Sequence, residues 1–164
     1  MKRLILIITI LILSSCQWIY DRGEDIVFPE IPHMGFKTIQ EVMAYTSQIM
    51  YVSDSIHDCD EYWQSPDQTY IWQCGDCEDY SILAMYFLHH ELGLNPFMVA
   101  GCCDAGWHTW VEVDGEWWEP QAACRCDNYQ SSFTHIYTIR YAEVIYRSTH
   151  SHKALSEKES GRIN

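Results

Sequence analysis

The spacing of apolar residues changes once along the chain, and this change is the strongest constraint on the fold. Before Pro96, apolar residues recur every three or four positions in segments 38–52 and 77–92, which is typical of amphipathic helices. After Pro96 the period is two, which indicates strands, in these segments: 97–103, 108–113 and 116–119. Helices followed by strands predict an α+β domain with an antiparallel sheet.

Local signals indicate where the helices begin and end. Thr38 and Glu41 form a capping-box pair that opens the first helix. Asp76 can cap the second, with Asp79 three residues later as a capping-box-like partner. Gly93 stands where a helix stop is expected. The best-marked element is therefore a helix that begins directly after Asp76.

The dipeptide Asp114-Gly115 is a strong hairpin signal. A two-residue loop here places Trp110 opposite Glu119. Because side chains alternate along a strand, His108, Trp110 and Glu119 then share one face of the sheet. His108 lies diagonally from Glu119, at about 7–8 Å by backbone, within reach of a carboxylate–imidazole hydrogen bond.

The other segments are less clearly marked. Residues 53–73 are polar and aromatic and contain Pro66, so we expect a loop-rich segment. Residues 133–146 suggest one or two further strands, and the polar residues 147–164 suggest a frayed tail.

Acidic residues outnumber basic ones both in the whole chain and in residues 37–146. The 164 residues include 23 acidic and 10 basic ones, for a net charge of −13. Residues 37–146 alone carry −14, with Lys37, Arg125 and Arg140 as their only basic residues. Because a phosphate backbone is bound by clustered Lys and Arg, we expect no nucleic-acid partner.

The N-terminus has the pattern of an exported lipoprotein. Lys2 and Arg3 precede residues 4–13, which are apolar except for Thr9. This stretch is too short to span a bilayer but is suited to a secretory signal. The Leu-Ser-Ser-Cys that follows resembles a bacterial lipobox and predicts lipidation of Cys16, which would anchor the chain to a membrane. The alternatives are an ordinary signal peptide and a buried helix that happens to end in Cys.

This pattern sets the expected organisation and location. Gln17, in place of Asp, favours sorting to the outer membrane. We therefore expect a lipid-anchored protein of the bacterial cell envelope, at the periplasmic face of the outer membrane. The expected parts are a signal peptide, a tether, one domain and a polar tail, with these bounds: 1–15, 16–35, 36–146 and 147–164.

Cys77, His108 and Glu119 together suggest nucleophilic catalysis. Cys77 falls in the first turn of the second helix, where the helix dipole favours a thiolate. His108 would be its base and Glu119 would orient the imidazole, which is the general logic of a catalytic triad. The neighbouring carboxylates oppose the effect of the dipole: Asp76, Glu78 and Asp79.

Three blocks of sequence resemble the transglutaminase-like cysteine peptidase superfamily. They are Gly-Asp-Cys at residues 75–77, His-Thr-Trp-Val-Glu-Val at 108–113 and Trp-Trp-Glu-Pro at 117–120. Residues 63–79 are closer still to the bacterial transglutaminase-like cysteine peptidases, some of which are periplasmic and cleave large adhesins. The sequence departs from the family pattern at Thr109, where Ala is common, and at Glu119, where Asp is usual.

The resemblance implies a papain/transglutaminase-like core, with N-terminal helices and a catalytic Cys at a helix start packed on an antiparallel sheet. Cys77 would attack a carbonyl, His108 would carry the proton to the leaving amine, and Glu119 would fix the imidazole tautomer. The main-chain N–H of Cys77 would bind the oxyanion, together with an upstream side chain, Trp63 or alternatively Gln73.

The resemblance also raises the question of calcium. Some adhesin-cleaving relatives bind calcium through carboxylates beside the nucleophile, and Asp76 and Glu78 match those positions. Oxygen ligands of this kind suit calcium. The alternative is that both residues serve the helix N-terminus. No other cofactor is required.

Six cysteines remain without a role: Cys59, Cys74, Cys102, Cys103, Cys124 and Cys126. An even number in an exported protein suggests disulfides. Free thiols, a redox pair at Cys74 and Cys77, and a zinc site that adds Cys124 and Cys126 are the alternatives.

The leading hypothesis is a lipid-anchored thiol hydrolase, a peptidase or amidase that acts on protein or peptide. A transamidase would use the same three residues. A third possibility is a lipoprotein of the same fold that binds peptide or glycan without catalysis, on an aromatic surface formed by Trp107, Trp110, Trp117 and Trp118. A small redox or zinc lipoprotein is the fourth.

Overall fold

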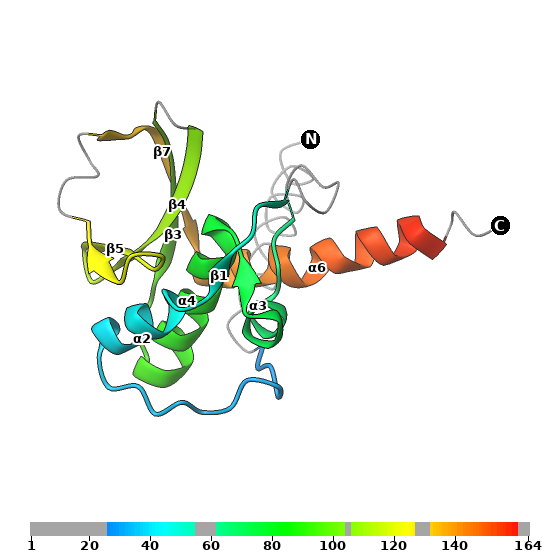
Figure 1. Ribbon diagram of the computed structural model, residues 1–164, viewed down its shortest axis with the longest axis horizontal. Coiled ribbons are helices and arrows are strands. Elements are labelled where there is room, and N and C mark those ends of the chain that lie inside the picture. Colours follow the sequence, from blue (N-terminus) through cyan, green and yellow to red (C-terminus); the bar gives the residue numbers. More distant parts are fainter. Residues whose placement is uncertain (1–25, 55–61, 104–105, 127–131, 161–164) are drawn as a thin grey trace, which may run out of the picture.

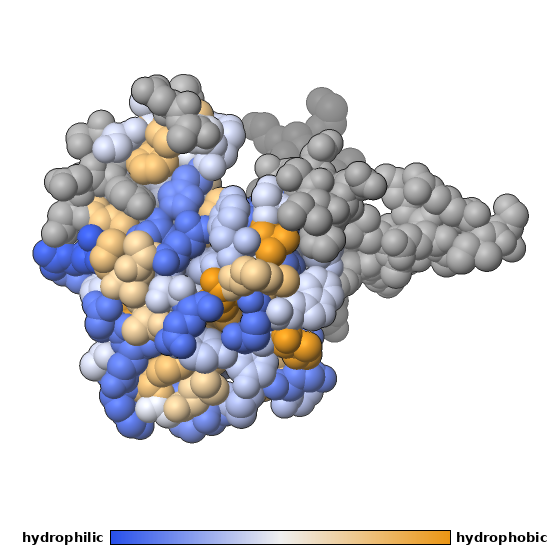
Figure 2. Space-filling model, in the orientation of Figure 1, coloured by the Kyte–Doolittle hydropathy of each residue, from blue (hydrophilic) through white to orange (hydrophobic). Residues whose placement is uncertain are grey.

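The computed structural model describes residues 26–54, 62–103, 106–126 and 132–160 (Figure 1). The predicted signal peptide and Cys16 lie outside these residues. Within the described part of the chain, no helix is both long enough and apolar enough to cross a membrane. On the face shown in Figure 2, hydrophilic residues surround small, separate hydrophobic patches.

The architecture is α+β, as the change of periodicity predicted. Strands β3 (Phe97–Cys103), β4 (Gly106–Val113), β5 (Glu116–Glu119), β6 (Cys124–Arg125) and β7 (Thr134–Arg140) form an antiparallel sheet in the order β6-β5-β4-β3-β7. Helix α4 (Cys77–Leu92) packs against one face of this sheet, mainly on β4. Helices α2 (Ile39–Thr46) and α3 (Pro66–Trp72) pack on α4.

Helix α4 is the centre of the core, and its ends are those that the sequence predicted. The Asp79 carboxylate accepts a hydrogen bond from the Asp76 main-chain N–H at 3.2 Å, and Gly93 ends the helix in the left-handed conformation, at a φ of 67°. The side chains of Ile82, Leu83, Met85, Phe87 and Leu88 are fully buried. Because this helix is buried along most of its length, it fixes the position of its first residue, Cys77, against the sheet.

The hairpin has the predicted register. Asp114 and Gly115 both have positive φ, at 53° and 78°, as a tight two-residue hairpin turn requires. Val113 pairs with Glu116 and Val111 with Trp118. Continuing this register places Trp110 level with Glu119.

Two predictions for the region before α4 are wrong. The predicted helix 38–52 ends at Thr46, and the short strand β1 (Met50–Tyr51) pairs in parallel with β2 (Cys74–Gly75), which leads directly into α4. The expected loop contains α3. Its start is stabilised by the Gln68 side chain, which accepts a hydrogen bond from the Ser65 N–H at 3.0 Å, and by the proline that follows Ser65.

The C-terminal prediction is correct for one strand but wrong for the tail. Residues 133–146 contain one strand, β7, and then helix α6 (Tyr141–Ser160) begins and continues through most of the expected tail. Four residues at the start of this helix are buried: Tyr141, Val144, Ile145 and Ser148. Their spacing of three, one and three residues is typical of one face of a helix. Alternating apolar residues just before them conceal this change of period.

Candidate active site

Cys77, the first residue of α4, contacts both its own helix and the sheet. Its thiol donates a hydrogen bond to a Glu78 carboxylate oxygen at 3.0 Å and is also hydrogen-bonded by Thr109 on β4. The Ser81 hydroxyl donates to the Cys77 carbonyl at 2.9 Å and lies 3.2 Å from the Thr109 hydroxyl. These bonds hold the start of α4 against β4 at residue 109.

The environment of Cys77 favours the neutral thiol. Burial raises the pKa of Cys77, and Glu78 raises it further by its charge and its hydrogen bond, whereas the hydrogen bonds from Thr109 lower it. The helix dipole alone would favour the thiolate. In this arrangement, burial and the Glu78 carboxylate therefore outweigh the helix terminus.

His108 and Glu119 form the contact that the hairpin register predicted. The imidazole Nε2 lies 2.6 Å from Oε2 of Glu119, a buried residue whose other oxygen accepts the Gln121 main-chain N–H at 3.0 Å. Because an ionised carboxylate only accepts hydrogen bonds, Nε2 must carry the proton. In the neutral ring, Nδ1 then bears the lone pair that a general base needs.

Two contacts place these residues along β4. Glu119 contacts His108, and Cys77 contacts Thr109, the next residue along the strand. The rings of Trp110 and Phe133 both stack on the imidazole, each at a centroid distance of 6.1 Å. These contacts restrict the orientation of the imidazole.

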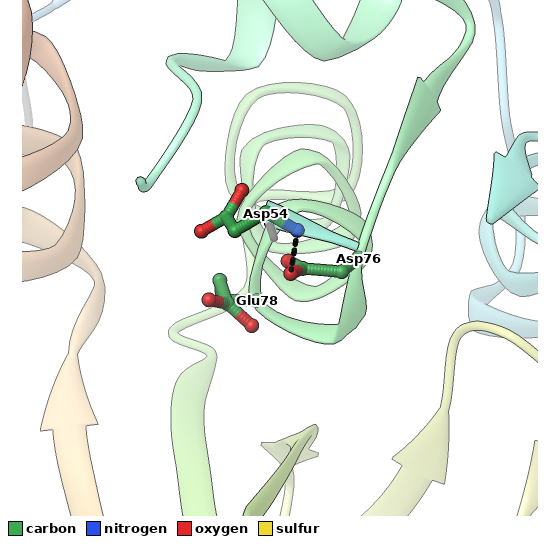
Figure 3. Close-up of side chains that lie close together, drawn as sticks. All are labelled: Asp54, Asp76 and Glu78. Carbon is green, nitrogen blue, oxygen red and sulfur yellow. Dashed lines mark hydrogen bonds between the residues drawn. The ribbon is translucent and has the colours of Figure 1, made fainter. Parts of the chain in front are cut away.

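A cluster of three buried carboxylates lies beside the thiol. Oxygens of Asp54, Asp76 and Glu78 all lie within 4.8 Å of one another, and Figure 3 shows the three groups facing a shared space. One Asp76 oxygen accepts the Asp54 main-chain N–H at 3.3 Å, while the other has no hydrogen-bond partner among the described residues. Burial, followed by the charge of Glu78, raises the pKa of Asp76 to about 8.

The sequence predicted Asp76 and Glu78 as metal ligands but not Asp54. Asp54 is 22 residues from Asp76 and approaches it because β1 runs parallel to β2. No local motif marks Asp54. Finding it from the sequence would have required knowledge of this non-local pairing.

Asp79 is a fourth buried carboxylate with a structural role. Its two oxygens accept the main-chain N–H groups of Gln64, at 2.8 Å, and Asp76. Burial raises the pKa of Asp79 to about 8, although these two hydrogen bonds lower it. Asp79 therefore ties the segment before α3 to the start of α4.

The two candidate oxyanion donors have different surroundings. Trp63 is half-buried and packs against the core. Gln73 is exposed, and its amide donates to the Tyr70 carbonyl and, at 3.5 Å, to the Tyr45 hydroxyl. Gln64, which no sequence motif marks, is buried, and its Oε1 has no partner among the described residues. Its main-chain N–H donates to Asp79.

Among the residues that the structure describes, the cysteines form none of the expected disulfides. All six cysteines in the described residues are free thiols; Cys59 lies outside that part of the chain. Cys102 and Cys103 are adjacent on β3, where alternation directs their side chains to opposite faces. The metal-ligating group found among the described residues is the acidic one, so the structure gives the zinc alternative no support.

No protein-family model and no curated protein matches the chain. Among solved structures, it is similar to Legionella pneumophila LapG. For the EGTA-treated form the TM-score is 0.51 at 18% identity, over 62% of this chain and 61% of that chain. For the calcium-bound form the TM-score is 0.49 at 19% identity, over 62% of each chain.

The similarity with the EGTA-treated form spans about three-fifths of LapG and shows the fold alone. The two proteins share an α+β core. In this chain, that core contains a helix that begins at Cys77 and packs on a five-stranded antiparallel sheet. The fold class predicted from the sequence is therefore confirmed.

Proposed function

We propose that this protein is a thiol hydrolase, a peptidase or amidase that cleaves proteins or peptides through an acyl-enzyme. The observation that carries the proposal is the 2.6 Å contact between His108 and Glu119, directly beside the strand residue that hydrogen-bonds Cys77. The fold supports it, because LapG is a bacterial transglutaminase-like cysteine protease.

Catalysis begins when the Cys77 side chain turns from Glu78 towards His108. Nδ1 of the imidazole takes the thiol proton and the sulphur attacks the substrate carbonyl. Glu119 holds the proton on Nε2 and stabilises the imidazolium that forms. His108 then gives the proton to the leaving amine, and water hydrolyses the thioester.

The developing oxyanion is bound at the start of α4. The main-chain N–H of Cys77 lies in the first turn of the helix, where N–H groups have no partner within the helix. Trp63 is the proposed second donor, and Gln73 is the alternative. Of the two, only Trp63 faces the core.

Asp54, Asp76 and Glu78 are the proposed ligands of a calcium ion. Three buried carboxylates with an unpartnered oxygen are costly without a cation, and oxygen donors are those that calcium prefers. The LapG structures include a calcium-bound form. A bound calcium ion would supply positive charge that offsets the carboxylates around the thiol, and it would engage Glu78, the present acceptor of the Cys77 hydrogen bond.

The catalytic proposal is tested with a proteome-derived peptide library, with calcium present, and cleavage is read by mass spectrometry. We expect cleavage that iodoacetamide abolishes and that is lost in Cys77→Ser and in His108→Ala. Cys103→Ser, which removes another thiol of the domain, is the control and should cleave normally. Activity that survives in either of the first two variants, with the fold verified by circular dichroism, refutes the triad.

Calcium is tested separately on the unmodified protein. EGTA should abolish cleavage and lower the melting temperature, and added calcium should restore both. Asp54→Asn should weaken calcium binding measured by calorimetry, whereas Asp114→Asn, an exposed position where Asn keeps the turn, should not. Equal calcium affinity in both variants contradicts the site.

We also propose that the chain is exported and anchored through a lipid on Cys16, at the periplasmic face of the outer membrane. The support is the signal and lipobox pattern of residues 1–16. Globomycin should block processing, and radiolabelled palmitate should label the wild-type protein but not Cys16→Ser. A Cys16→Ser protein that is still labelled contradicts the anchor.

A further inference from the structure

The register of the sheet places two aromatic side chains on the same face as the contact with Cys77. Ala100 pairs with Thr109 on one side and with Tyr137 on the other, and Cys102 pairs with Trp107. Paired residues share a face, and Trp107 is two positions from Thr109 on β4. Trp107 and Tyr137 therefore lie on the face of the sheet that α4 packs against.

Helix α4 leaves this end of the sheet uncovered. The helix begins at the level of Thr109 and runs from there along β4 towards Val111 and Val113, which are buried. In Figure 1, β3, β4 and β7 continue past the start of α4, and no described helix covers that stretch. Trp107 and Tyr137 are 60% and 56% exposed.

The two rings form one platform. Their centroids lie 5.9 Å apart with an interplanar angle of 28°, so they stack in parallel. They meet across β3, where the facing side chains, Ala100 and Cys102, are small. Of the four tryptophans that the sequence suggested as an aromatic surface, Trp110 is fully buried, and Trp117 and Trp118 are half-buried. Of these four, only Trp107 is exposed.

The charge of the domain indicates which side chain suits this platform. Residues 37–146 carry a net charge of −14, and Arg125, one of their three basic residues, is paired with Glu116 at 2.8 Å. Such a field attracts cationic segments and raises their rate of association. An exposed indole face binds a guanidinium or ammonium group by cation–π attraction, most strongly when the ring is Trp.

We propose that Trp107 and Tyr137 bind a Lys or Arg side chain of the polypeptide substrate, close to the carbonyl that Cys77 attacks. This inference rests on the proposed hydrolase function and adds a substrate class to it: extended, cationic polypeptide segments. The platform and the thiol lie at the same end of the sheet, so a chain that crosses the platform continues to the start of α4.

The test starts from the cleavage sites found in the peptide library. We expect Lys or Arg to be enriched at one fixed position relative to the cleaved bond. Synthetic peptides for one Arg-containing site are then compared with the same peptides in which citrulline, which is neutral and nearly isosteric, replaces the Arg. For the wild-type protein, kcat/KM should be about 5-fold higher for the Arg peptide.

Variants assign this preference to the platform. In Trp107→Leu, which keeps an apolar side chain but removes the indole π face, the Arg-to-citrulline ratio should fall clearly below the wild-type value, to the preference that Tyr137 and the acidic field still support. Trp107→Phe should keep part of the ratio. Trp72→Leu, which removes an exposed tryptophan from α3, should leave it unchanged. Melting temperatures verify that each variant is folded.

The outcomes separate the two proposals. Absence of any cleavage that depends on Cys77 refutes the hydrolase and the platform together. Cleavage without a Lys or Arg preference, or with a preference that Trp107→Leu retains in full, refutes the platform alone. Only a preference that decreases when the indole is removed supports it.

Discussion

Replacing Glu119 by Gln tests the most specific interaction in the site. The carboxylate uses one oxygen for the His108 N–H, at 2.6 Å, and the other for the Gln121 main-chain N–H, at 3.0 Å. A Gln side chain has one acceptor and one donor end. If its oxygen keeps the bond to Gln121, its NH2 faces Nε2, and the imidazole must move its proton to Nδ1, the atom that should receive the thiol proton.

The magnitude follows from these two effects. A hydrogen bond to a charged group contributes about 1.5–3 kcal/mol, and losing it in the transition state lowers the rate about 10- to 150-fold. The wrong tautomer adds to this loss, and tautomer loss in a serine-protease triad reaches about 10⁴-fold. We therefore expect Glu119→Gln to lower kcat between about 10²- and 10⁴-fold, with a smaller effect on KM.

Two assays measure this change. One is kcat on a peptide taken from the library, and the other is the rate of Cys77 alkylation by iodoacetamide between pH 5 and 9. Glu119→Asp is the control, because it keeps the charge on a shorter side chain and should retain more activity than Glu119→Gln. Wild-type kcat and an unchanged alkylation profile in Glu119→Gln would refute the reasoning, provided that the melting temperature shows a folded variant.

Three further predictions concern stability. A Cβ added at Gly75 would lie 2.6 Å from the Asp79 Cβ, so Gly75→Ala should destabilise the fold by about 1–3 kcal/mol in urea unfolding; an unchanged midpoint would contradict this close packing. Trp110 is fully buried, and Trp110→Ala should cost about 3–5 kcal/mol, so a loss under 1 kcal/mol would contradict its role as the packing support of His108. Burial lowers the pKa of His90 below its ordinary value of 6.5. Below pH 6.5 the unfolded chain therefore binds more protons than the folded one. The stability of the fold is full above pH 6.5 and falls as the pH drops through the lowered pKa. His90→Gln should lose less stability than the wild type between pH 7.5 and 5, measured by thermal unfolding, and an equal loss would contradict this assignment.

Features set by neighbouring residues could be predicted from the sequence. The start of α4 depends on Asp76 and Asp79, which are three residues apart, and the hairpin register depends on Asp114-Gly115. The contact between His108 and Glu119 followed from that register by counting residues. It was predictable because an antiparallel hairpin converts sequence separation directly into distance.

Features set by distant contacts could not be predicted in the same way. Asp54 joins the acidic cluster only because β1 pairs with β2, and a two-residue strand has too little pattern to be recognised. The hydrogen bond from the Cys77 thiol to the Glu78 carboxylate depends on side-chain conformations within one helical turn. Helix α3 is different: its Ser65-Pro66 start was visible in the sequence, but the aromatic residues around it concealed the signal.

The hairpin turn has a consequence for how this sequence can vary. The position of Glu119 beside the imidazole depends on the number of residues in the turn, and on their identity only through the positive φ that the turn requires. Inserting or deleting one residue at Asp114-Gly115 would move Glu119 to the other face of the sheet while the strands could still pair. Substitutions that allow positive φ should be tolerated here, whereas natural variants of altered length should be rare and should lack the carboxylate partner of His108.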